Sequence, residues 1–246
     1  MLIKEVVDPH ILNKIDIKPD DPRYPMYRDT IEKYTSYSGN ISDLLHKMYK
    51  GSTVPNANNL NIEEIKMLDD IMYHHPIKRS IIVYHGTKYS PFRLWFKDRV
   101  PLNQPVLEHF PAYISTSTDF YTASRFARED EIVIPRDITK YIRGNKKDFI
   151  DNETYNDDYF IDNETQSNDA IATPNILKIR VPMGTPGLSV ESMSDHPGEN
   201  EILLGRGLEI QINPYPTYIK EIDGLVWDCK VKYINPTPEF FKEAEI

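Results

Sequence analysis

The sequence predicts an α+β fold formed by a single domain over residues 1–246. Apolar residues with helical spacing occur in the first third of the chain, and β-branched runs occur mostly later. The two kinds of segment do not alternate strictly, as they would in a parallel α/β fold. The 246 residues are 39% hydrophobic and 11% aromatic, which suffices for a sizeable core, and no linker or internal repeat divides them.

The N-terminal third is expected to be helical after an irregular arm. Residues 1–24 contain several prolines and aspartates, and they lead into a helix near 25–36. A second helix is predicted at 41–50, because its apolar residues recur at helical spacing. Asn61 is the expected N-cap of a third helix over 61–74, whose first turn carries two glutamates that suit the helix dipole.

The middle of the chain predicts two strands, a helix and an insertion. The β-branched run at 80–84 and the run at 113–117 both indicate strands. Asp119 is expected to cap a helix that continues to about Arg128. Residues 144–172 are acidic, rich in Asn and poor in aliphatic side chains, so we expect an exposed insertion there.

The C-terminal third is predicted to be mostly β structure. Strands are expected at 175–181, 188–191, 201–204 and 208–212. The last two are expected to pair as a hairpin through the Gly-Arg-Gly segment at 205–207. From Leu225 to Tyr233 apolar residues alternate with polar ones, which predicts a strand that places Cys229 in the core.

Composition narrows the classes of function. Asp plus Glu total 38 and Lys plus Arg total 29, and this net charge of −9 favours protein partners over nucleic acid. The single cysteine excludes a disulfide framework, and we expect no metal site because the His74-His75 pair lacks partners at metal-ligand spacing. No apolar run reaches the ~18 residues of a membrane span, and no signal-peptide pattern is present, so a soluble protein of the cytoplasm or of a host cytosol is expected.

The segment Glu199-Asn200-Glu201 carries the most chemical information. If it belongs to a strand, both glutamates face the same side, about 7 Å apart. Two carboxylates on one face repel each other and cost desolvation, and such pairs often act on a cation or a hydroxyl. The alternative is a pair of solvent-facing glutamates at the mouth of a hairpin.

Three strand-end motifs stand in order along the chain: Tyr84-His85-Gly86-Thr87, Ser115-Thr116-Ser117 and Glu199-Asn200-Glu201. Together with the segments 40–45 and 181–194, they resemble the ADP-ribosyltransferase family, in its branch with Arg, Ser-Thr-Ser and Glu-x-Glu motifs. The resemblance covers about residues 35–233. Within the family, the chain is similar to mono-ADP-ribosyltransferase toxins and to phage or viral enzymes. It implies N-terminal helices packed on a split β core of two sheets.

The resemblance also implies an activity. NAD would be the co-substrate, its nicotinamide–ribose bond would be cleaved, and ADP-ribose would pass to a protein acceptor, with arginine implied by Glu199. Glu201 would stabilise positive charge on the ribose, Glu199 would orient and deprotonate the acceptor, and Ser115 would fix Glu201. The further NAD-binding residues that it implies are His85, Gly86, Thr87, Thr116 and Ser117, with Gly86 permitting close backbone approach to the dinucleotide.

One departure leaves other functions open. His85 stands where this branch has arginine, and His-Gly-Thr is the motif of the poly(ADP-ribose) polymerase and diphtheria-toxin-like branch. A histidine reaches less far than arginine and is mostly neutral at pH 7. A catalytically weak or inactive NAD-binding module and an NAD glycohydrolase therefore remain alternatives, as does a nucleic-acid acceptor, against which the charge counts.

Phe126 is expected in the core, and Arg206 in either a phosphate contact or a salt bridge.

Overall fold

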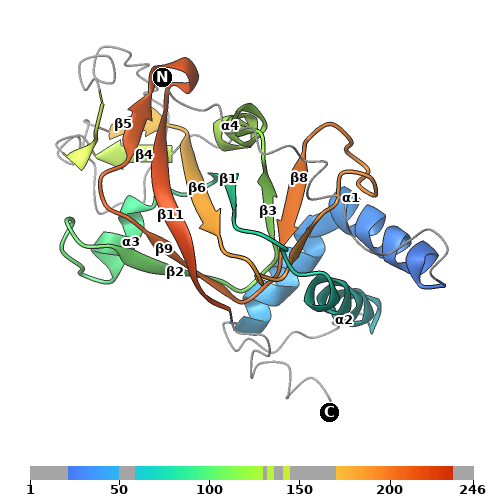
Figure 1. Ribbon diagram of the computed structural model, residues 1–246. Coiled ribbons are helices and arrows are strands. Elements are labelled where there is room, and N and C mark those ends of the chain that lie inside the picture. Colours follow the sequence, from blue (N-terminus) through green and yellow to red (C-terminus); the bar gives the residue numbers. More distant parts are fainter. Residues whose placement is uncertain (1–21, 50–58, 130–131, 136–140, 145–169, 235–246) are drawn as a thin grey trace.

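The computed structural model describes residues 22–49, 59–129, 132–135, 141–144 and 170–234 (Figure 1). Helices α1 (Tyr24–Tyr49) and α2 (Asn59–His74) precede the first strand, and most later elements are strands. This order confirms the expected α+β class. In the part of the chain that is described, no helix is long and apolar enough to cross a membrane.

A nine-stranded sheet forms the centre of the molecule. Its strands, in spatial order, are β2 (Val106–Phe110), β9 (Leu208–Ile212), β11 (Gly224–Ile234), β6 (Asn175–Val181), β1 (Ile81–Thr87), β3 (Ile114–Ser117), β8 (Glu201–Leu204) and β7 (Gly187–Ser189). The ninth strand, β10 (Thr217–Ile219), pairs with β11 and is followed by the 3-10 helix η3 (Lys220–Ile222). Strands β4 (Ile132–Pro135) and β5 (Ala170–Thr173) form a separate pair.

The large sheet is split in the middle. Strands β1 and β6 pair over seven residues and β3 and β8 over four, whereas β1 and β3 share one registered pair, Tyr84 with Ser117. This pair joins one half of β2, β9, β11, β6 and β1 to a second half of β3, β8 and β7. The expected split β core is confirmed in this form.

Each half of the sheet has its own apolar cover. Helices α1 and α2 lie on the β8 side, where Leu68 of α2 and Leu203 of β8 belong to one buried cluster (Figure 1). Helix α3 (Phe92–Lys97) packs on the other half, with the rings of Trp95 and Trp227 stacked at 5.7 Å between centroids. Cys229 of β11 is buried in the same cluster, as predicted.

The predicted helices are confirmed with shifted bounds. The segments expected at 25–36 and 41–50 form the single helix α1, which is kinked at Tyr37 with φ −139° and ψ 38°. The helix expected after Asp119 is α4 (Phe120–Glu129). Asp119 caps it as predicted, because its carboxylate accepts the backbone N–H of Tyr121 at 3.1 Å and of Thr122 at 3.2 Å.

The predicted hairpin between 201–204 and 208–212 is wrong. Strand β8 pairs with β3 and β7, whereas β9 pairs with β2 and β11, so the chain crosses from one half of the sheet to the other. The backbone N–H of Gly205 donates to the Pro186 carbonyl at 2.8 Å, and that of Gly207 donates to the Phe110 carbonyl at 2.9 Å. Each glycine is thus bonded within its own half, and no hairpin turn forms.

Several elements were not expected from the sequence, among them α3, β2 and β10. Strand β5 takes up the last three residues of the predicted insertion 144–172, which therefore ends earlier than expected. Residues 145–169 of that insertion and residues 1–21 of the predicted arm lie outside the described residues.

Candidate active site

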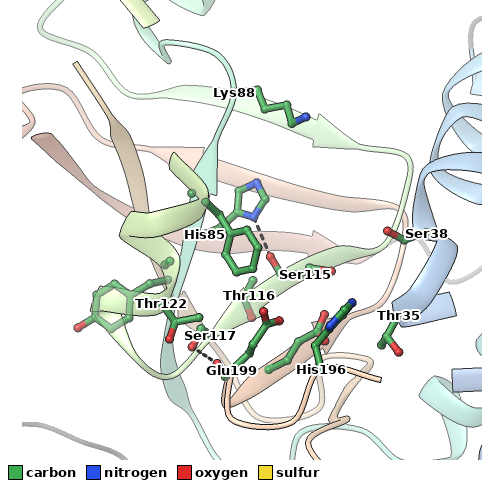
Figure 2. Close-up of a pocket in the computed structure, with 15 residues that line it drawn as sticks. Thr35, Ser38, His85, Lys88, Ser115, Thr116, Ser117, Thr122, His196 and Glu199 are labelled. Atoms are coloured by element: carbon green, nitrogen blue, oxygen red, sulfur yellow. Dashed lines mark hydrogen bonds between the residues drawn. The ribbon is translucent and has the colours of Figure 1, made fainter. Parts of the chain in front are cut away.

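A pocket of about 520 Å³ lies where the two halves of the sheet meet (Figure 2). This volume falls within the ~300–1,000 Å³ of small-molecule sites. Its walls come from α1, β1, β3, α4 and the loop before β8. Most of the residues that the sequence analysis assigned to a site line it, namely His85, Gly86, Ser115, Thr116, Ser117, Glu199 and Glu201.

Glu201, the first residue of β8, is a buried carboxylate in this pocket, with 8% of its surface exposed. Burial raises the pKa of its carboxyl, and the nearby charges of Glu199 and Glu191 raise it further. A hydrogen bond from the Ser115 hydroxyl and the proximity of His196 act in the opposite direction. Ser115 therefore stabilises the ionised form of Glu201.

Thr116 and Ser117 use their hydroxyls to hold the backbone. Thr116 Oγ1 donates to the carbonyl of Ile202 at 2.6 Å, across the β3–β8 ladder. Ser117 Oγ donates to the carbonyl of Glu199 at 2.6 Å and accepts the backbone N–H of Asp119 at 2.9 Å. Both side chains line the pocket, but their hydroxyls already have protein partners.

Glu199 lies in a turn and not in strand β8, which corrects the expectation that strand alternation aligns the two glutamates. β8 begins at Glu201, and Asn200 before it has a left-handed φ of 50°. Both carboxylates nevertheless face one pocket. The turn is held by Glu191, whose carboxylate accepts the backbone N–H of Gly198 at 2.5 Å and of Asn200 at 2.8 Å.

His85 of β1 bridges the split in the sheet. Its Nδ1 lies 2.8 Å from the backbone carbonyl oxygen of Ser115 on β3. A carbonyl oxygen only accepts, so Nδ1 carries the proton and the neutral ring presents Nε2 as an acceptor. Burial lowers the pKa of the imidazole and outweighs the bond to Ser115, which raises it. The ring is therefore neutral at pH 7.

Gly86 and Thr87, which were both expected to bind NAD, also make local structural contacts. A Cβ on Gly86 would lie 2.4 Å from the Ala123 carbonyl oxygen and 2.6 Å from the Ala127 nitrogen, so glycine permits the close packing of α4 on β1. The Thr87 hydroxyl lies 3.2 Å from both the backbone nitrogen and the carbonyl oxygen of Tyr89. Thr87 is not among the residues that line the pocket.

The family model of the ADP-ribosyltransferase exoenzyme matches residues 25–228 of this sequence. The chain belongs to this family. The match spans the N-terminal helices and all the motifs that line the pocket, and it identifies the chain as an ADP-ribosyltransferase. A comparison with curated proteins gave no match.

Solved structures of ADP-ribosyltransferases share the fold. The C3 exoenzyme of Clostridium limosum is 14% identical, with 84% of this chain and 85% of that chain covered and a TM-score of 0.50. An ADP-ribosyltransferase toxin from Paenibacillus larvae is 16% identical over 85% and 86% of the two chains, with a TM-score of 0.50. The enzymatic component of the C2-toxin from Clostridium botulinum is 14% identical over 85% of this chain and 43% of its own, with a TM-score of 0.53.

Sequence reasoning missed several residues of this ADP-ribosyltransferase pocket. Thr35 and Ser38 line it from either side of the kink in α1. Lys88 is the one Lys or Arg among the described residues that line the pocket, and Figure 2 shows it on the other side of His85 from Glu199. Its position after a strand-end histidine is a signal that sequence alone does not separate from any surface lysine.

The aromatic wall of the pocket also differs from expectation. Phe126, expected in the core, lines the pocket and is 45% exposed. Phe120 is the buried aromatic of α4, with its ring edge-on to Tyr84 at 5.4 Å between centroids. The exposed face of α4 thus supplies one aromatic ring to the site.

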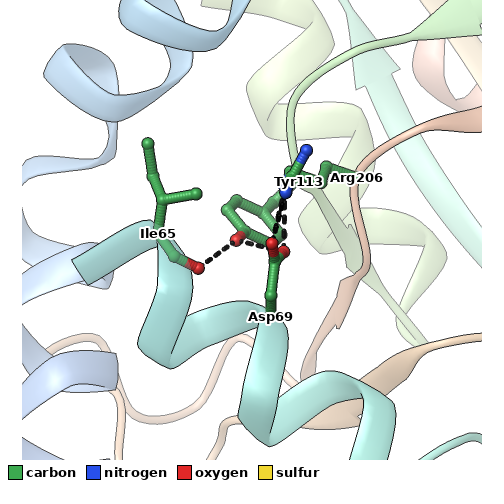
Figure 3. Close-up of polar contacts among 4 residues, drawn as sticks. All are labelled: Ile65, Asp69, Tyr113 and Arg206. Carbon is green, nitrogen blue, oxygen red and sulfur yellow. Dashed lines mark hydrogen bonds and ion pairs between the residues drawn. The ribbon is translucent and has the colours of Figure 1, made fainter. Parts of the chain in front are cut away.

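Arg206 forms a salt bridge outside the pocket of the transferase (Figure 3). Its Nε lies 2.9 and 3.0 Å from the two carboxylate oxygens of Asp69 on α2, and its Nη2 contacts the same carboxylate. The Tyr113 hydroxyl donates to Asp69 at 2.7 Å and lies 3.0 Å from the carbonyl of Ile65. Of the two roles open for Arg206, the structure shows the salt bridge.

Proposed function

We propose that this ADP-ribosyltransferase uses NAD to modify a protein acceptor with a single ADP-ribose, on an arginine side chain. The convergence of Glu199, Glu201 and Ser115 in one pocket at the split in the sheet carries this proposal. A carboxylate pair matches the two requirements of the reaction, which are stabilisation of a cationic sugar and removal of a proton from the acceptor. A guanidinium suits Glu199, because a carboxylate holds it through two parallel hydrogen bonds.

The distribution of charge in the pocket fits a dinucleotide. Glu199 and Glu201 supply negative charge at one side, where positive charge develops on the nicotinamide ribose. Lys88 supplies positive charge on the other side of His85, which suits the phosphates. The Nε2 atom of His85 accepts a hydrogen bond from a ribose hydroxyl, and Phe126 offers a ring face for nicotinamide.

The proposed reaction transfers ADP-ribose from nicotinamide to the acceptor, so one bond to ribose C1′ breaks and another forms. The bond between ribose C1′ and the nicotinamide nitrogen breaks, and its electron pair neutralises the pyridinium ring. Glu201 stabilises the positive charge on the ribose through the 2′-hydroxyl, while Ser115 keeps that carboxylate ionised and oriented. The acceptor nitrogen bonds to C1′ with its lone pair, and its proton passes to Glu199.

The first test compares wild type with Glu201→Gln and Glu199→Gln. Each protein is incubated with labelled NAD and a cell lysate, and labelled protein and free nicotinamide are measured in the same tube. We expect labelling to be lost in both variants and nicotinamide release to survive in Glu199→Gln alone. Mass spectrometry of the labelled peptides then shows whether arginine carries the ADP-ribose.

The neutral His85 favours one alternative, a non-catalytic NAD-binding module. Absence of both labelling and nicotinamide from the wild type, with NAD binding retained in calorimetry, would support that alternative. Nicotinamide release without any labelled protein would instead identify an NAD glycohydrolase.

A further inference from the structure

We propose that Glu191 positions Glu199 for the acceptor step and thereby sets how much ADP-ribose reaches an acceptor instead of water. This inference rests on the proposed transferase function. Glu191 is not among the residues that line the pocket, and both of its carboxylate oxygens accept backbone N–H groups. It acts through the turn and not on substrate.

The turn needs this support because of its backbone conformation. Gly198 has φ 100° and Asn200 has φ 50°, so residues on both sides of Glu199 are left-handed. Asparagine adopts this conformation more readily than most residues with a side chain but still at a cost, which contacts with the surroundings offset. The Glu191 carboxylate binds the amides of these same two residues, at 2.5 Å and 2.8 Å. Hydrogen bonds to an ionised acceptor are about twice as strong as neutral ones.

Glu191 is itself fixed near the start of the loop that joins β7 to β8, residues 190–200. The preceding residue, Val190, is fully buried, and its backbone N–H donates to the carbonyl of Glu201 at 3.2 Å. The Glu199 carbonyl accepts the Ser117 hydroxyl at 2.6 Å. Glu199 is therefore held through its own carbonyl and through the amide on either side, and these contacts direct its carboxylate.

The far side of the same loop is attached to helix α1. The backbone N–H of Asp195 donates to Thr35 Oγ1 at 3.1 Å, and Ser36 Oγ donates to the Asp195 carboxylate at 3.0 Å. Loss of the Glu191 contacts therefore leaves the loop attached at Asp195 and releases mainly the turn. Glu201 lies in the β3–β8 ladder opposite Ser117, so it moves less than Glu199 does.

Two variants separate the charge of Glu191 from its geometry. Glu191→Gln keeps the length of the side chain but cannot accept both N–H groups, and Glu191→Asp keeps the charge but is too short to span them. Glu63→Gln, on the exposed surface of α2, is the matched control. For each protein we would measure ADP-ribose transfer to agmatine, a small guanidine acceptor, and nicotinamide release without acceptor.

We expect both Glu191 variants to lower transfer by roughly 10- to 100-fold, since a displacement of about 1 Å in a reacting group has costs of this order. Nicotinamide release should fall much less, and the control should match wild type in both rates. Equal losses of transfer and release, or no loss of transfer, would overturn the inference. A loss in Glu191→Gln alone would assign the effect to charge and would also overturn it.

A second measurement does not depend on activity. Hydrogen exchange of the Gly198 and Asn200 amides should be roughly tenfold faster in both Glu191 variants than in wild type or the control. If the wild type neither labels acceptors nor releases nicotinamide, the proposed function fails, and faster exchange at these amides still identifies Glu191 as the support of the turn. Unchanged exchange would refute that role, whatever the activity.

Discussion

The Glu201 carboxylate lies where its negative charge is unfavourable for folding and where the proposed reaction requires that charge. It is 8% exposed, and burial is the largest cause of its raised pKa. A carboxyl whose pKa is raised in the folded state binds its proton more tightly there than in the unfolded chain. The ionised form therefore reduces stability as pH rises through the unfolded pKa, and the full penalty is present above the folded pKa.

Glu201→Gln is thus expected to inactivate the protein and to raise its melting temperature at pH 7. The difference in melting temperature from wild type should shrink as pH falls toward the range in which Glu201 is protonated. Differential scanning calorimetry at several pH values tests this expectation. A variant that is less stable than wild type at pH 7 would contradict it.

Ser115→Ala should shift the acid limb of the pH–rate profile to higher pH. The Ser115 hydroxyl lowers the pKa of Glu201, so its loss raises that pKa further, and a larger share of the carboxyl is protonated at a given pH. The proposed mechanism needs the ionised form, so kcat/KM should fall first at the acidic end. Profiles of nicotinamide release for the two proteins would show the shift, and coincident acid limbs would argue against it.

Lys88→Gln should weaken NAD binding more than it slows chemistry. A hydrogen bond to a charged group contributes about 1.5–3 kcal/mol, so we expect KM for NAD to rise by about tenfold or more. Lys230→Gln, at an exposed position on β11, is the control for a lost surface charge. Steady-state kinetics measure kcat and the KM for NAD of each variant. A fall in kcat with unchanged KM would show that Lys88 does not contact the phosphates.

At the level of secondary structure, the close packing of helix α4 on strand β1 depends on a glycine, Gly86. Gly86→Ala would place a Cβ 2.4 Å from the Ala123 carbonyl oxygen, a backbone atom that moves only with the helix. Overpacking of this kind costs about 1–3 kcal/mol. We expect a lower midpoint of urea unfolding and weaker NAD binding, because α4 forms one wall of the pocket.

Gly39→Ala is the matched control for this substitution. Gly39 lies in helix α1, and a Cβ there would meet no atom within 4 Å. Alanine in an exposed helical position gains about 0.5–1 kcal/mol over glycine. The two Gly→Ala variants should therefore move the unfolding midpoint in opposite directions, and parallel shifts would show that α4 adjusts to the added methyl group.

Over the whole molecule, the Asp69–Arg206 pair ties helix α2 to the segment where the chain crosses between the halves of the sheet. Arg206 is 7% exposed and Asp69 19% exposed by side chain, so removal of one partner leaves a poorly hydrated charge. Asp69→Asn is expected to lower the free energy of unfolding by about 3–5 kcal/mol. Urea denaturation beside Glu63→Gln measures the difference, and a loss below about 1 kcal/mol would mark the pair as a surface-type contact.

Sequence patterns predicted which segments form helices and strands better than they predicted which strands pair. The pairing of 201–204 with 208–212 was wrong because other strands occupy both edges of each: β8 pairs with β3 and β7, and β9 pairs with β2 and β11. The segment between them is also held by a distant residue. Here Asp69, more than a hundred residues earlier, binds Arg206. A local pattern contains no information on such a distant partner.

Those residues of the candidate site that belong to a sequence motif could be predicted. Those that only the folded structure brings to the site could not. The residues of the Ser-Thr-Ser and Glu-x-Glu motifs line one pocket, as their order in the chain suggested. Glu191 and Lys88 belong to no motif, and the roles proposed for them depend on a turn and a cavity that form only in the folded chain. The position of Glu199 shows the same point, since a turn and not strand alternation brings it beside Glu201.

The narrow junction between β1 and β3 also bears on how this site can change during evolution. The His-Gly-Thr motif lies in one half of the sheet, and Ser-Thr-Ser and Glu201 lie in the other. The ladder between them is one residue pair, and His85 reaches across to a backbone carbonyl, which every amino acid at position 115 would offer. A changed side chain at position 115 would therefore leave this contact between the two halves in place, because the acceptor belongs to the main chain.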